Sequence, residues 1–317
     1  MRKQIIAALL SGLLGIMIIG CADRRPKQTP LRQNTGSLTI GVLPDVNSIP
    51  FIIAKRNGYF EKEGVAVNIE HFKSAMERDT ALQTGNIDGA VSDMLAVVFF
   101  NDNGFEVKIT SKTNGSFKLV AGKHSSVTSL KQVNGKTIGI SANTIIEYLT
   151  DSIMETAGMD TKAAKKIAIP KIPTRLEMLA KGKLDLAVLP EPLASVALTK
   201  GGSILSSSDR LGLQPGVMVF TPEAIECETE AIKALYRAYN RAVAYLKEEK
   251  PENYAEDLIK EAGFPETVKE TLTLPNYSKA SMPREKELEA VLHWLQAKHL
   301  TSSHYSLDQL SDPRFIE

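Results

Sequence analysis

Polar side chains lie at a strand end or a helix start at five places along this chain. These places are Pro44–Ser48, Ser74–Met76, Ser92–Asp93, Ser141–Thr144 and Pro190–Pro192. In α/β proteins, ligands bind outside the carboxyl ends of the strands, where helix N-termini present free backbone N–H groups. Any one of these Ser, Asp or Asn residues is more often a helix cap than a ligand-binding group. Taken together, the five places predict a polar cleft for a small ligand.

The sequence lacks the local motifs of common catalytic and nucleotide-binding sites. Gly135-Lys136-Thr137 ends like a phosphate-binding loop, but Leu130 occupies the place of the required leading glycine. Neither a G-x-G-x-x-G dinucleotide motif nor a G-x-S-x-G nucleophile motif occurs. The five histidines are scattered, and the two cysteines form no cluster at zinc-ligand spacing. We therefore expect a protein that is not an enzyme and has no cofactor and no metal site.

Alternating strands and helices are needed to position the polar residues. Short β-branched segments and helix-period segments alternate from Ser37, and the same plan begins again after Val127. Gly85–Val91 and Gly182–Val188 share the pattern G-x-[IL]-D-x-A-V, 97 positions apart, after the helical segments RDTALQT and RLEMLAK. Helix–glycine–strand turns are common, but seven aligned positions favour a duplicated unit. From Thr229 the pattern is helical, and we expect this tail to dock onto one of the lobes.

Length and charge exclude several classes of function. At roughly 150 residues per domain, 317 residues are enough for about two domains. Lys and Arg total 38 against 37 Asp and Glu, so the net charge of +1 provides no broad field that would hold polyanions. Aromatic residues make up only 6%, too few for a surface on which bases stack. We therefore expect no nucleic-acid partner, and the function must lie in a local site.

The N-terminal residues have the layout of an export signal. Arg2 and Lys3 precede the apolar run Ile5–Gly20, in which Ser11 is the only strongly polar side chain. As a helix, this run would reach about 24 Å, short of the roughly 30 Å hydrocarbon core of a membrane. We therefore predict residues 1–20 to be a cleaved signal peptide rather than a permanent spanning helix.

Cys21 directly follows this apolar run. The end of the run resembles the lipobox of bacterial lipoproteins, in which the cysteine thiol carries a diacylglycerol. The resemblance implies a lipid anchor at Cys21 on the extracytoplasmic face of the cell membrane, with residues 21–36 as a flexible, polar tether. If Cys21 is acylated, Cys227 has no partner for a disulfide. An ordinary signal peptide or an N-terminal anchor helix is the alternative.

Nearly the whole remaining chain resembles a known family. The resemblance rests on GVLPDVNSIPFIIAKRNGYFEKEGVAVNIEHF, RDTALQTGNIDGAVSD, KTIGIS, LDLAVLPEP and LSDPRFI, in this order. The family is the solute-binding proteins of the nitrate, sulfonate, taurine and thiamine-pyrimidine group, which are extracytoplasmic receptors of ABC importers. It implies an α/β fold of the type II periplasmic-binding-protein class, with two lobes of mixed sheets joined by two crossing strands.

The resemblance also implies domain boundaries. Lobe 1 would comprise residues 37–122 and 221–317, lobe 2 would comprise residues 123–220, and the crossing strands would lie near Lys118–Ala121 and Val217–Phe220. A solute that contacts both lobes only when they are closed shifts an equilibrium between open and closed states. The expected protein is a monomer that captures a small organic solute without changing it, with an ABC permease and its ATPase as partners.

Nine residues are expected to bind the solute: Asp45, Asn47, Ser48, Ser74, Asp93, Asn114, Asn143, Thr144 and Glu191. Unless Arg78 turns inward, Asp45, Asp93 and Glu191 would give the cleft three carboxylates, which favours a donor-rich or cationic solute such as an aminopyrimidine or a thiamine precursor. Sulfonate, taurine or nitrate anions are the alternative ligands. Two other functions remain open: a surface lipoprotein that serves no transporter, and an enzyme of thiamine-pyrimidine synthesis, whose cysteine-rich motif this sequence lacks.

Overall fold

The computed structural model describes residues 36–316, which lie in one compact unit of the chain. The predicted signal peptide (residues 1–20), the lipidation residue Cys21 and the predicted tether up to residue 35 lie outside the described residues. No helix in the described part combines the length and the apolar character needed to cross a membrane.

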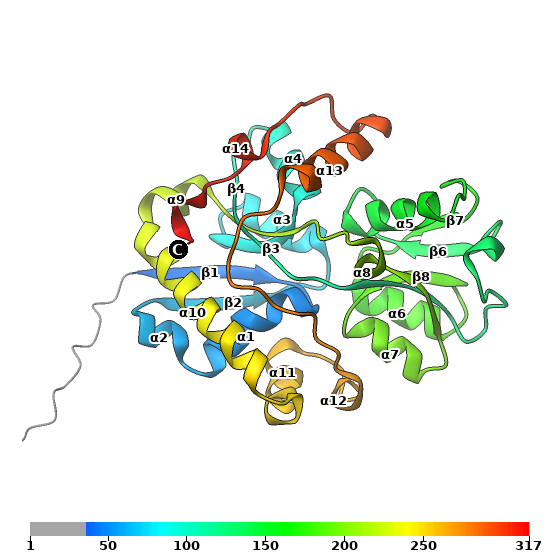
Figure 1. Cartoon of the computed structure of the whole chain (residues 1–317), viewed down its shortest axis with the longest axis horizontal. Helices are drawn as coiled ribbons and strands as arrows, with labels where there is room; N and C mark the ends of the chain where they lie inside the picture. The colour runs from blue at the N-terminus through cyan, green and yellow to red at the C-terminus, as the bar shows by residue number, and fades with distance from the viewer. Residues whose placement is uncertain (1–35, 317) are drawn as a thin grey trace, which may run out of the picture. The chain divides into compact units, whose positions relative to one another are not determined.

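The first sheet forms lobe 1 and lies among the blue and cyan elements of Figure 1. Its strand order is β2 (Ala66–His71), β1 (Ser37–Val42), β3 (Gly89–Asp93), β10 (Gly216–Phe220) and β4 (Lys108–Lys112). Strand β1 pairs in parallel with β2 and β3, whereas β10 is antiparallel to both of its neighbours. A late segment of the chain is therefore inserted between two early strands.

The second sheet, in green in Figure 1, repeats this plan in lobe 2. Its order is β7 (Lys165–Ala168), β6 (Thr137–Ile140), β8 (Leu186–Pro190), β5 (Phe117–Ala121) and β9 (Ser203–Ser207). Here β6 is parallel to β7 and β8, and β5 is the antiparallel inserted strand. Two mixed sheets with the same order confirm the predicted α/β fold with two lobes of mixed sheets.

Strand pairing moves the predicted lobe boundaries. Residues 37–122 were expected in lobe 1, but β5 pairs only with lobe 2 strands, because its ladder partners are β8 and β9. Residues 123–220 were expected in lobe 2, but β10 pairs with β3 and β4 of lobe 1. The chain therefore crosses between the lobes in the segments 113–116 and 212–215, because residues 208–211 form a short helix that still packs on β5 and β9 of lobe 2; it does not cross within β5 or β10 as predicted.

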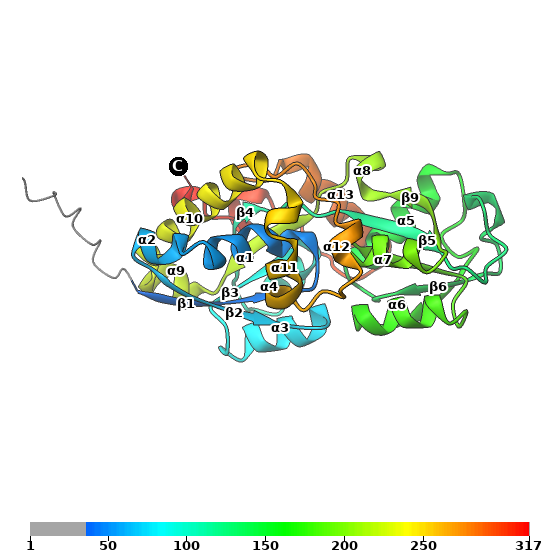
Figure 2. The same cartoon turned by 90° about the horizontal axis from the view of Figure 1, so that it is seen from below.

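Helices cover both faces of each sheet. On lobe 1, α1 (Ile49–Arg56) and α10 (Thr229–Glu248) cover one face, and α3 (Ala75–Gln83), α4 (Met94–Asp102) and α13 (Glu285–Ala297) cover the other. Figure 2 shows α3 on the opposite side of the sheet from α1 and α10. On lobe 2, α5 (Ile145–Thr156) covers one face, and α6 (Ile172–Ala180) and α7 (Leu193–Thr199) cover the other.

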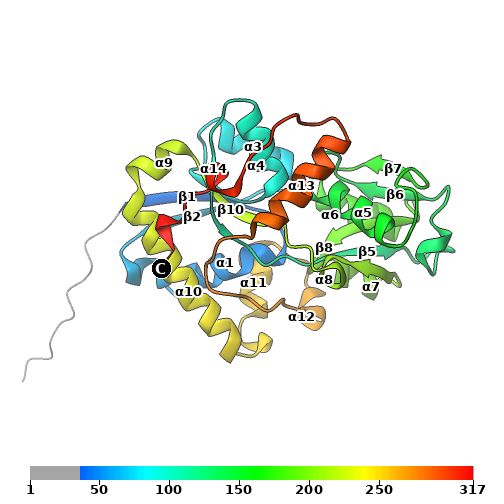
Figure 3. The ribbon, with the colours of Figure 1, turned by 45° about the horizontal axis from the view of Figure 1, so that its top comes forward.

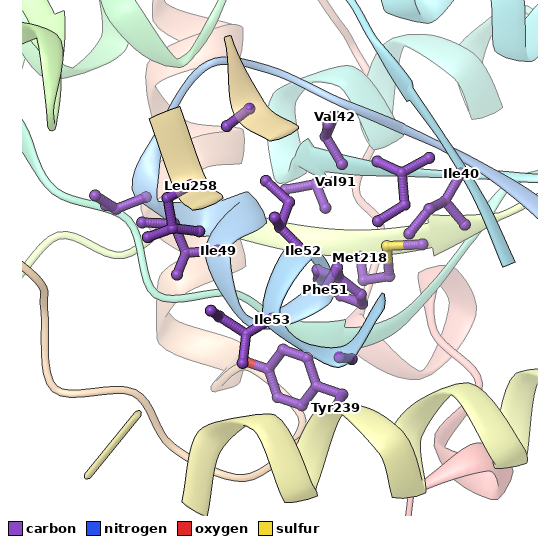
Figure 4. Close-up of a cluster of buried hydrophobic side chains, with 14 of the residues drawn as sticks. Ile40, Val42, Ile49, Phe51, Ile52, Ile53, Val91, Met218, Tyr239 and Leu258 are labelled. Carbon is purple, nitrogen blue, oxygen red and sulfur yellow. The ribbon is translucent and has the colours of Figure 1, made fainter. Parts of the chain in front are cut away.

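The core of lobe 1 forms where β1 and β10 meet α1 and α10, as Figure 4 shows. Ile40 and Met218, from the two strands, are fully buried beneath Phe51 of α1. The ring of Tyr239 on α10 lies 5.0 Å from that of Phe51, between centroids. Burying a side chain of this size contributes about 1.5–3 kcal/mol to the stability of the fold. This core therefore holds in place the strand ends that carry the loops of the site.

The tail after α10 contacts both lobes, which differs from the predicted docking onto one. It contains α11 (Ala255–Ala262), α12 (Val268–Thr271), α13 and α14 (Leu307–Leu310). Helix α12 contacts α7 of lobe 2, whereas α13 packs on α4 of lobe 1. Figure 3 shows α13, in orange, extending toward α5. The remaining short helices are α2 (Tyr59–Glu63), α8 (Ser208–Leu211) and α9 (Pro222–Cys227).

The repeated sequence pattern has the same local geometry in both lobes. Gly85 and Gly182 both adopt left-handed φ angles, of 70° and 68°. Three residues later, the carboxylate of Asp88 accepts a hydrogen bond from the backbone of strand β1, and that of Asp185 accepts one from strand β6. The repeat therefore places equivalent helices against equivalent strands in each lobe.

Candidate functional site

A small cavity lies between the lobes at the carboxyl ends of the parallel strands. Its volume is about 40 Å³. Its polar lining residues are Asp45, Asn47, Arg78, Ser92 and Asp93 from lobe 1 and Ser141, Thr144 and Arg175 from lobe 2. The apolar lining comes from Leu43, Ala75, Val91, Phe117, Ile145, Ile146, Pro170, Ile172 and Pro190. Since a water needs about 10–15 Å³, this arrangement of the lobes leaves room for a compact ligand only.

Asp45 and Asp93 are carboxylates buried in the lobe 1 wall. Asp45 accepts a hydrogen bond from the backbone N–H of Asn47 (2.9 Å), and Asp93 accepts one from that of Ala96 (3.0 Å). Each therefore caps the helical segment that follows its strand. Burial raises the pKa of both carboxyl groups to about 6, although the charge of Arg78 opposes this change.

Arg78, on α3, belongs to the same wall and is only 2% exposed. Its Nε donates to the carboxylate of Asp79 (2.8 Å), and its Nη1 donates to the backbone carbonyl of Val91 (2.9 Å). Its Nη2 lies 2.6 Å from the same Asp79 oxygen but has no hydrogen bond. Arg78 therefore turns inward, and its charge is already balanced by an adjacent acid.

Arg175, on α6, is the corresponding arginine of lobe 2 and is fully buried. Its Nε donates to the carbonyl of Val188 (2.9 Å) and its Nη1 donates to that of Ile169 (2.7 Å), while its Nη2 has no partner. No acidic side chain pairs with it in the part of the chain that the structure describes, and burial lowers its pKa to about 10. An unpaired buried cation of this kind is costly, so its cavity-facing position points to a ligand.

Arg175 was missing from the sequence-based candidates, although the repeat contained a signal for it. Arg78 and Arg175 are the first residues of the aligned segments RDTALQT and RLEMLAK. Both contact the carbonyl of the matching valine of the next strand, 13 positions later. Placing the two segments on equivalent helices would have identified both arginines.

Four of the nine predicted residues line the cavity: Asp45, Asn47, Asp93 and Thr144. Thr144 also caps α5 through its hydroxyl, which accepts from a backbone N–H at 3.2 Å. Their placement agrees with the expectation that polar residues at strand ends converge.

The other five predicted residues are not among those that line the cavity. Ser74 and Glu191 accept hydrogen bonds from the backbone N–H groups of the helices that follow them. Ser48 donates to a backbone carbonyl of its own loop, and Asn114 accepts from the tail at Ser278. Asn143 is exposed and adopts a left-handed φ of 56°. Because Glu191 is not part of the lining, the described cavity wall contains two of the three expected carboxylates, Asp45 and Asp93.

Asn47 links the cavity to the crossing segment 113–116 and to the first residue of β10. Its side-chain oxygen accepts a hydrogen bond from the hydroxyl of Thr113 (2.9 Å). Gly115 and Gly216 pack against it so closely that a Cβ atom would lie 2.7 Å and 3.1 Å, respectively, from its oxygen. A cavity residue therefore contacts one of the two segments that join the lobes and the start of the strand that follows the other.

A second contact between the lobes, which we call the clasp, comprises Lys298, Trp294, Glu147, Asp151 and Tyr148. Lys298, next to the end of α13, forms ion pairs with Glu147 and Asp151 of α5. The indole Nε1 of Trp294 donates to Asp151 (3.2 Å), and its ring meets that of Tyr148 edge-on, 5.8 Å between centroids. The clasp therefore joins the C-terminal tail to the helix that begins at the cavity.

Two α/β lobes that enclose a polar cavity are the architecture of type II periplasmic binding proteins. Residues 45–253, well over half of the chain, match the NMT1/THI5 like family, and the chain belongs to this family.

Relatives and solved structures agree with this assignment. A putative ABC transporter periplasmic binding protein of Brachyspira hyodysenteriae is 23% identical over 277 residues, covering 82% of this chain and 79% of the relative. The alkanesulfonate-binding protein SsuA from Xanthomonas axonopodis pv. citri, bound to MOPS, has a TM-score of 0.75 at 17% identity, covering 87% of this chain and 98% of its own. A ligand-binding component of an ABC-type import system from Staphylococcus aureus, with zinc bound, has a TM-score of 0.74 at 14% identity, covering 88% and 97%. At these identities the two structures establish a shared fold.

Proposed function

We propose that this protein is the extracytoplasmic substrate-binding component of an ABC importer and that it captures a small solute between its lobes. The observation that carries the proposal is the cavity between the lobes, whose lining residues hold three buried polar atoms without a hydrogen bond: Ser92 Oγ, Arg175 Nη2 and Arg78 Nη2, the last of which lies in an ion pair with Asp79. Buried donors without partners are rare in folded proteins, so a ligand or water is needed to satisfy them. The import systems named for two of its relatives support the assignment to transport.

Capture follows from the arrangement of the lobes. A solute that touches Arg78 of lobe 1 and Arg175 of lobe 2 gains both sets of contacts only when the lobes are closed. Binding then shifts the population toward the closed state without making or breaking a covalent bond. Movement would be absorbed in the segments 113–116 and 212–215.

Delivery requires the protein to stay near its transporter. We infer that Cys21 carries a lipid that holds the protein at the extracytoplasmic face of the membrane, where a permease and its ATPase accept the solute. Mass spectrometry of the membrane-bound protein should detect acyl groups on the peptide that begins at Cys21. A mature N-terminus elsewhere, without acylation, would contradict the anchor and leave the transport assignment standing.

The solute class first expected from the sequence was an aminopyrimidine or a related cation. That preference rested on three carboxylates and on Arg78 facing outward. Glu191 does not line the cavity and Arg78 does, so anionic groups on the solute gain support. Phe117 is the only aromatic residue in the described lining, which offers little stacking surface to a heteroaromatic ring.

Binding is tested by thermal denaturation of the purified protein lacking residues 1–21, with amines, amino acids, aminopyrimidines, alkylsulfonates and inorganic oxyanions. At a hundredfold excess over Kd, a bound solute should stabilise the fold by about 2.7 kcal/mol, which gives a measurable rise in Tm. The solute should be recovered unchanged after incubation. Absence of saturable binding across the panel, or conversion of the bound compound, would refute the proposal.

A further inference from the structure

The two lobes carry equivalent arginines in unequal electrostatic surroundings. Arg78 and Arg175 lie 97 positions apart, on the first helical turns of α3 and α6, and both line the cavity. Their aliphatic stems pack on equivalent glycines: a Cβ atom at Gly41 would lie 3.3 Å from Arg78 Cγ, and one at Gly139 would lie 3.2 Å from Arg175 Cγ. The duplicated unit therefore places one equivalent guanidinium group in each lobe, on opposite walls of the cavity.

The residue that follows each arginine differs. Arg78 is followed by Asp79, which accepts its Nε hydrogen bond. Arg175 is followed by Leu176, which is buried and cannot balance a charge. In lobe 2, the guanidinium is therefore left with two carbonyl partners and a free Nη2. This side of the cavity requires a negative group to complete it.

The lobe 1 side has the opposite excess. Asp45 and Asp93 both line the cavity, and each uses one carboxylate oxygen to cap a helix. Arg78 is the only cationic side chain in this wall of the described cavity, and Asp79 already pairs with it. A cationic or strongly hydrogen-donating group is therefore favoured next to Asp45 and Asp93.

Building on the proposed function, we propose that the cavity selects a small zwitterion, whose acidic group pairs with Arg175 of lobe 2 and whose ammonium group faces Asp45 and Asp93 of lobe 1. The small cavity volume limits the solute to a compact molecule, and the opposite charges of the two walls favour a zwitterion over a singly charged one. Each end of the solute is attracted by one lobe, so the solute bridges the two lobes when they close.

The test measures calorimetric Kd values for glycine, β-alanine, γ-aminobutyrate and taurine, with propylamine and propionate as single-charge controls. The expected result is that at least one zwitterion binds tenfold or more tightly than both controls. Taurine against β-alanine distinguishes a sulfonate from a carboxylate at Arg175. The proposal is refuted if a single-charge control binds as tightly as the best zwitterion.

Substitutions test which side chain binds each end of the solute. Arg175→Met should weaken zwitterion binding by about tenfold to hundredfold and leave propylamine binding unchanged, because a charged hydrogen bond is lost only at the acidic end. Arg175→Lys keeps the charge and should retain part of the affinity, so it remains informative if the Met variant fails to fold. Asp93→Asn should weaken zwitterion binding but not propionate binding. Arg210→Met, at an exposed position outside the cavity lining, is the matched control and should bind as the parent does.

The outcomes separate this inference from the function on which it rests. If the parent binds aminopyrimidines or simple anions saturably and Arg175→Lys binds them equally well, the zwitterion is refuted while solute capture stands. If no zwitterion, amine, pyrimidine, sulfonate or oxyanion binds, both proposals fail.

Discussion

Replacing Asp93 by Asn should stabilise the protein at neutral pH while it weakens solute binding. Burial raises the pKa of the Asp93 carboxyl from 3.8 to about 6 in the folded protein, with the attraction of Arg78 already opposing this change. At 1.36 kcal/mol per pKa unit, the difference corresponds to about 3 kcal/mol. Because the folded pKa is the higher one, the stabilising contribution is complete below pH 3.8 and is lost as the pH rises through about 6. Asparagine cannot ionise, and its side-chain oxygen can still accept the hydrogen bond from Ala96.

Urea denaturation of the parent and of Asp93→Asn at pH 4, 6 and 8 measures this effect. The variant should be more stable than the parent by up to about 3 kcal/mol at pH 8, and the difference should shrink to about 0.5 kcal/mol at pH 4. Asp308→Asn, at an exposed position outside the cavity lining, is the control substitution. If Asp93→Asn is less stable than the parent at pH 8, or differs from it equally at all three pH values, then burial does not penalise this carboxylate. A site that lowers stability in this way is common where binding needs a charge.

Three further substitutions test other contacts. Lys298→Met removes the ion pairs of the clasp, so the solute should dissociate several-fold faster in stopped-flow measurements. The free energy of unfolding should change by less than about 1 kcal/mol, because Lys298 is partly exposed. An unchanged dissociation rate would show that the clasp does not hold the lobes together. Gly216→Ala places a Cβ atom 2.6 Å from the hydroxyl of Thr113. This clash should lower the free energy of unfolding by about 1–3 kcal/mol and perturb Asn47. If chemical denaturation gives the variant the same stability as the parent, the close packing at Gly216 is contradicted. Tyr236→Phe removes a buried hydroxyl hydrogen bond of 2.6 Å and should cost about 1 kcal/mol by calorimetry, and a neutral result would mean that water replaces it.

The framework was predictable because it depends on local patterns. Strand and helix periodicity, together with the repeat at Gly85 and Gly182, is enough to predict two similar α/β lobes. The crossing points were misplaced because β5 and β10 have ordinary strand sequences, and only their ladder partners decide which lobe each joins. The antiparallel insertion of a distant strand is determined by tertiary packing, and a local sequence pattern does not predict it.

The site was predictable in part for a similar reason. Asp45 and Asp93 lie at strand ends, where polar residues converge in this fold, and both line the cavity. Ser74 and Glu191 have the same local pattern, but their side chains are used in helix capping. Arg175 lies on a helix that reads as amphipathic from its sequence. Its burial depends on packing against Gly139, 36 positions earlier, which a local pattern does not contain.

Asp79 and Leu176 occupy equivalent positions in the two lobes, and the difference between them has an evolutionary consequence. One codon at position 176 decides whether the lobe 2 guanidinium has a built-in neutralising neighbour, and lobe 1 demonstrates that an aspartate beside the arginine is compatible with this framework. If Arg175 binds the acidic end of the solute, an aspartate at position 176 should lower the preference for acidic solutes while the strands, helices and connections stay in place.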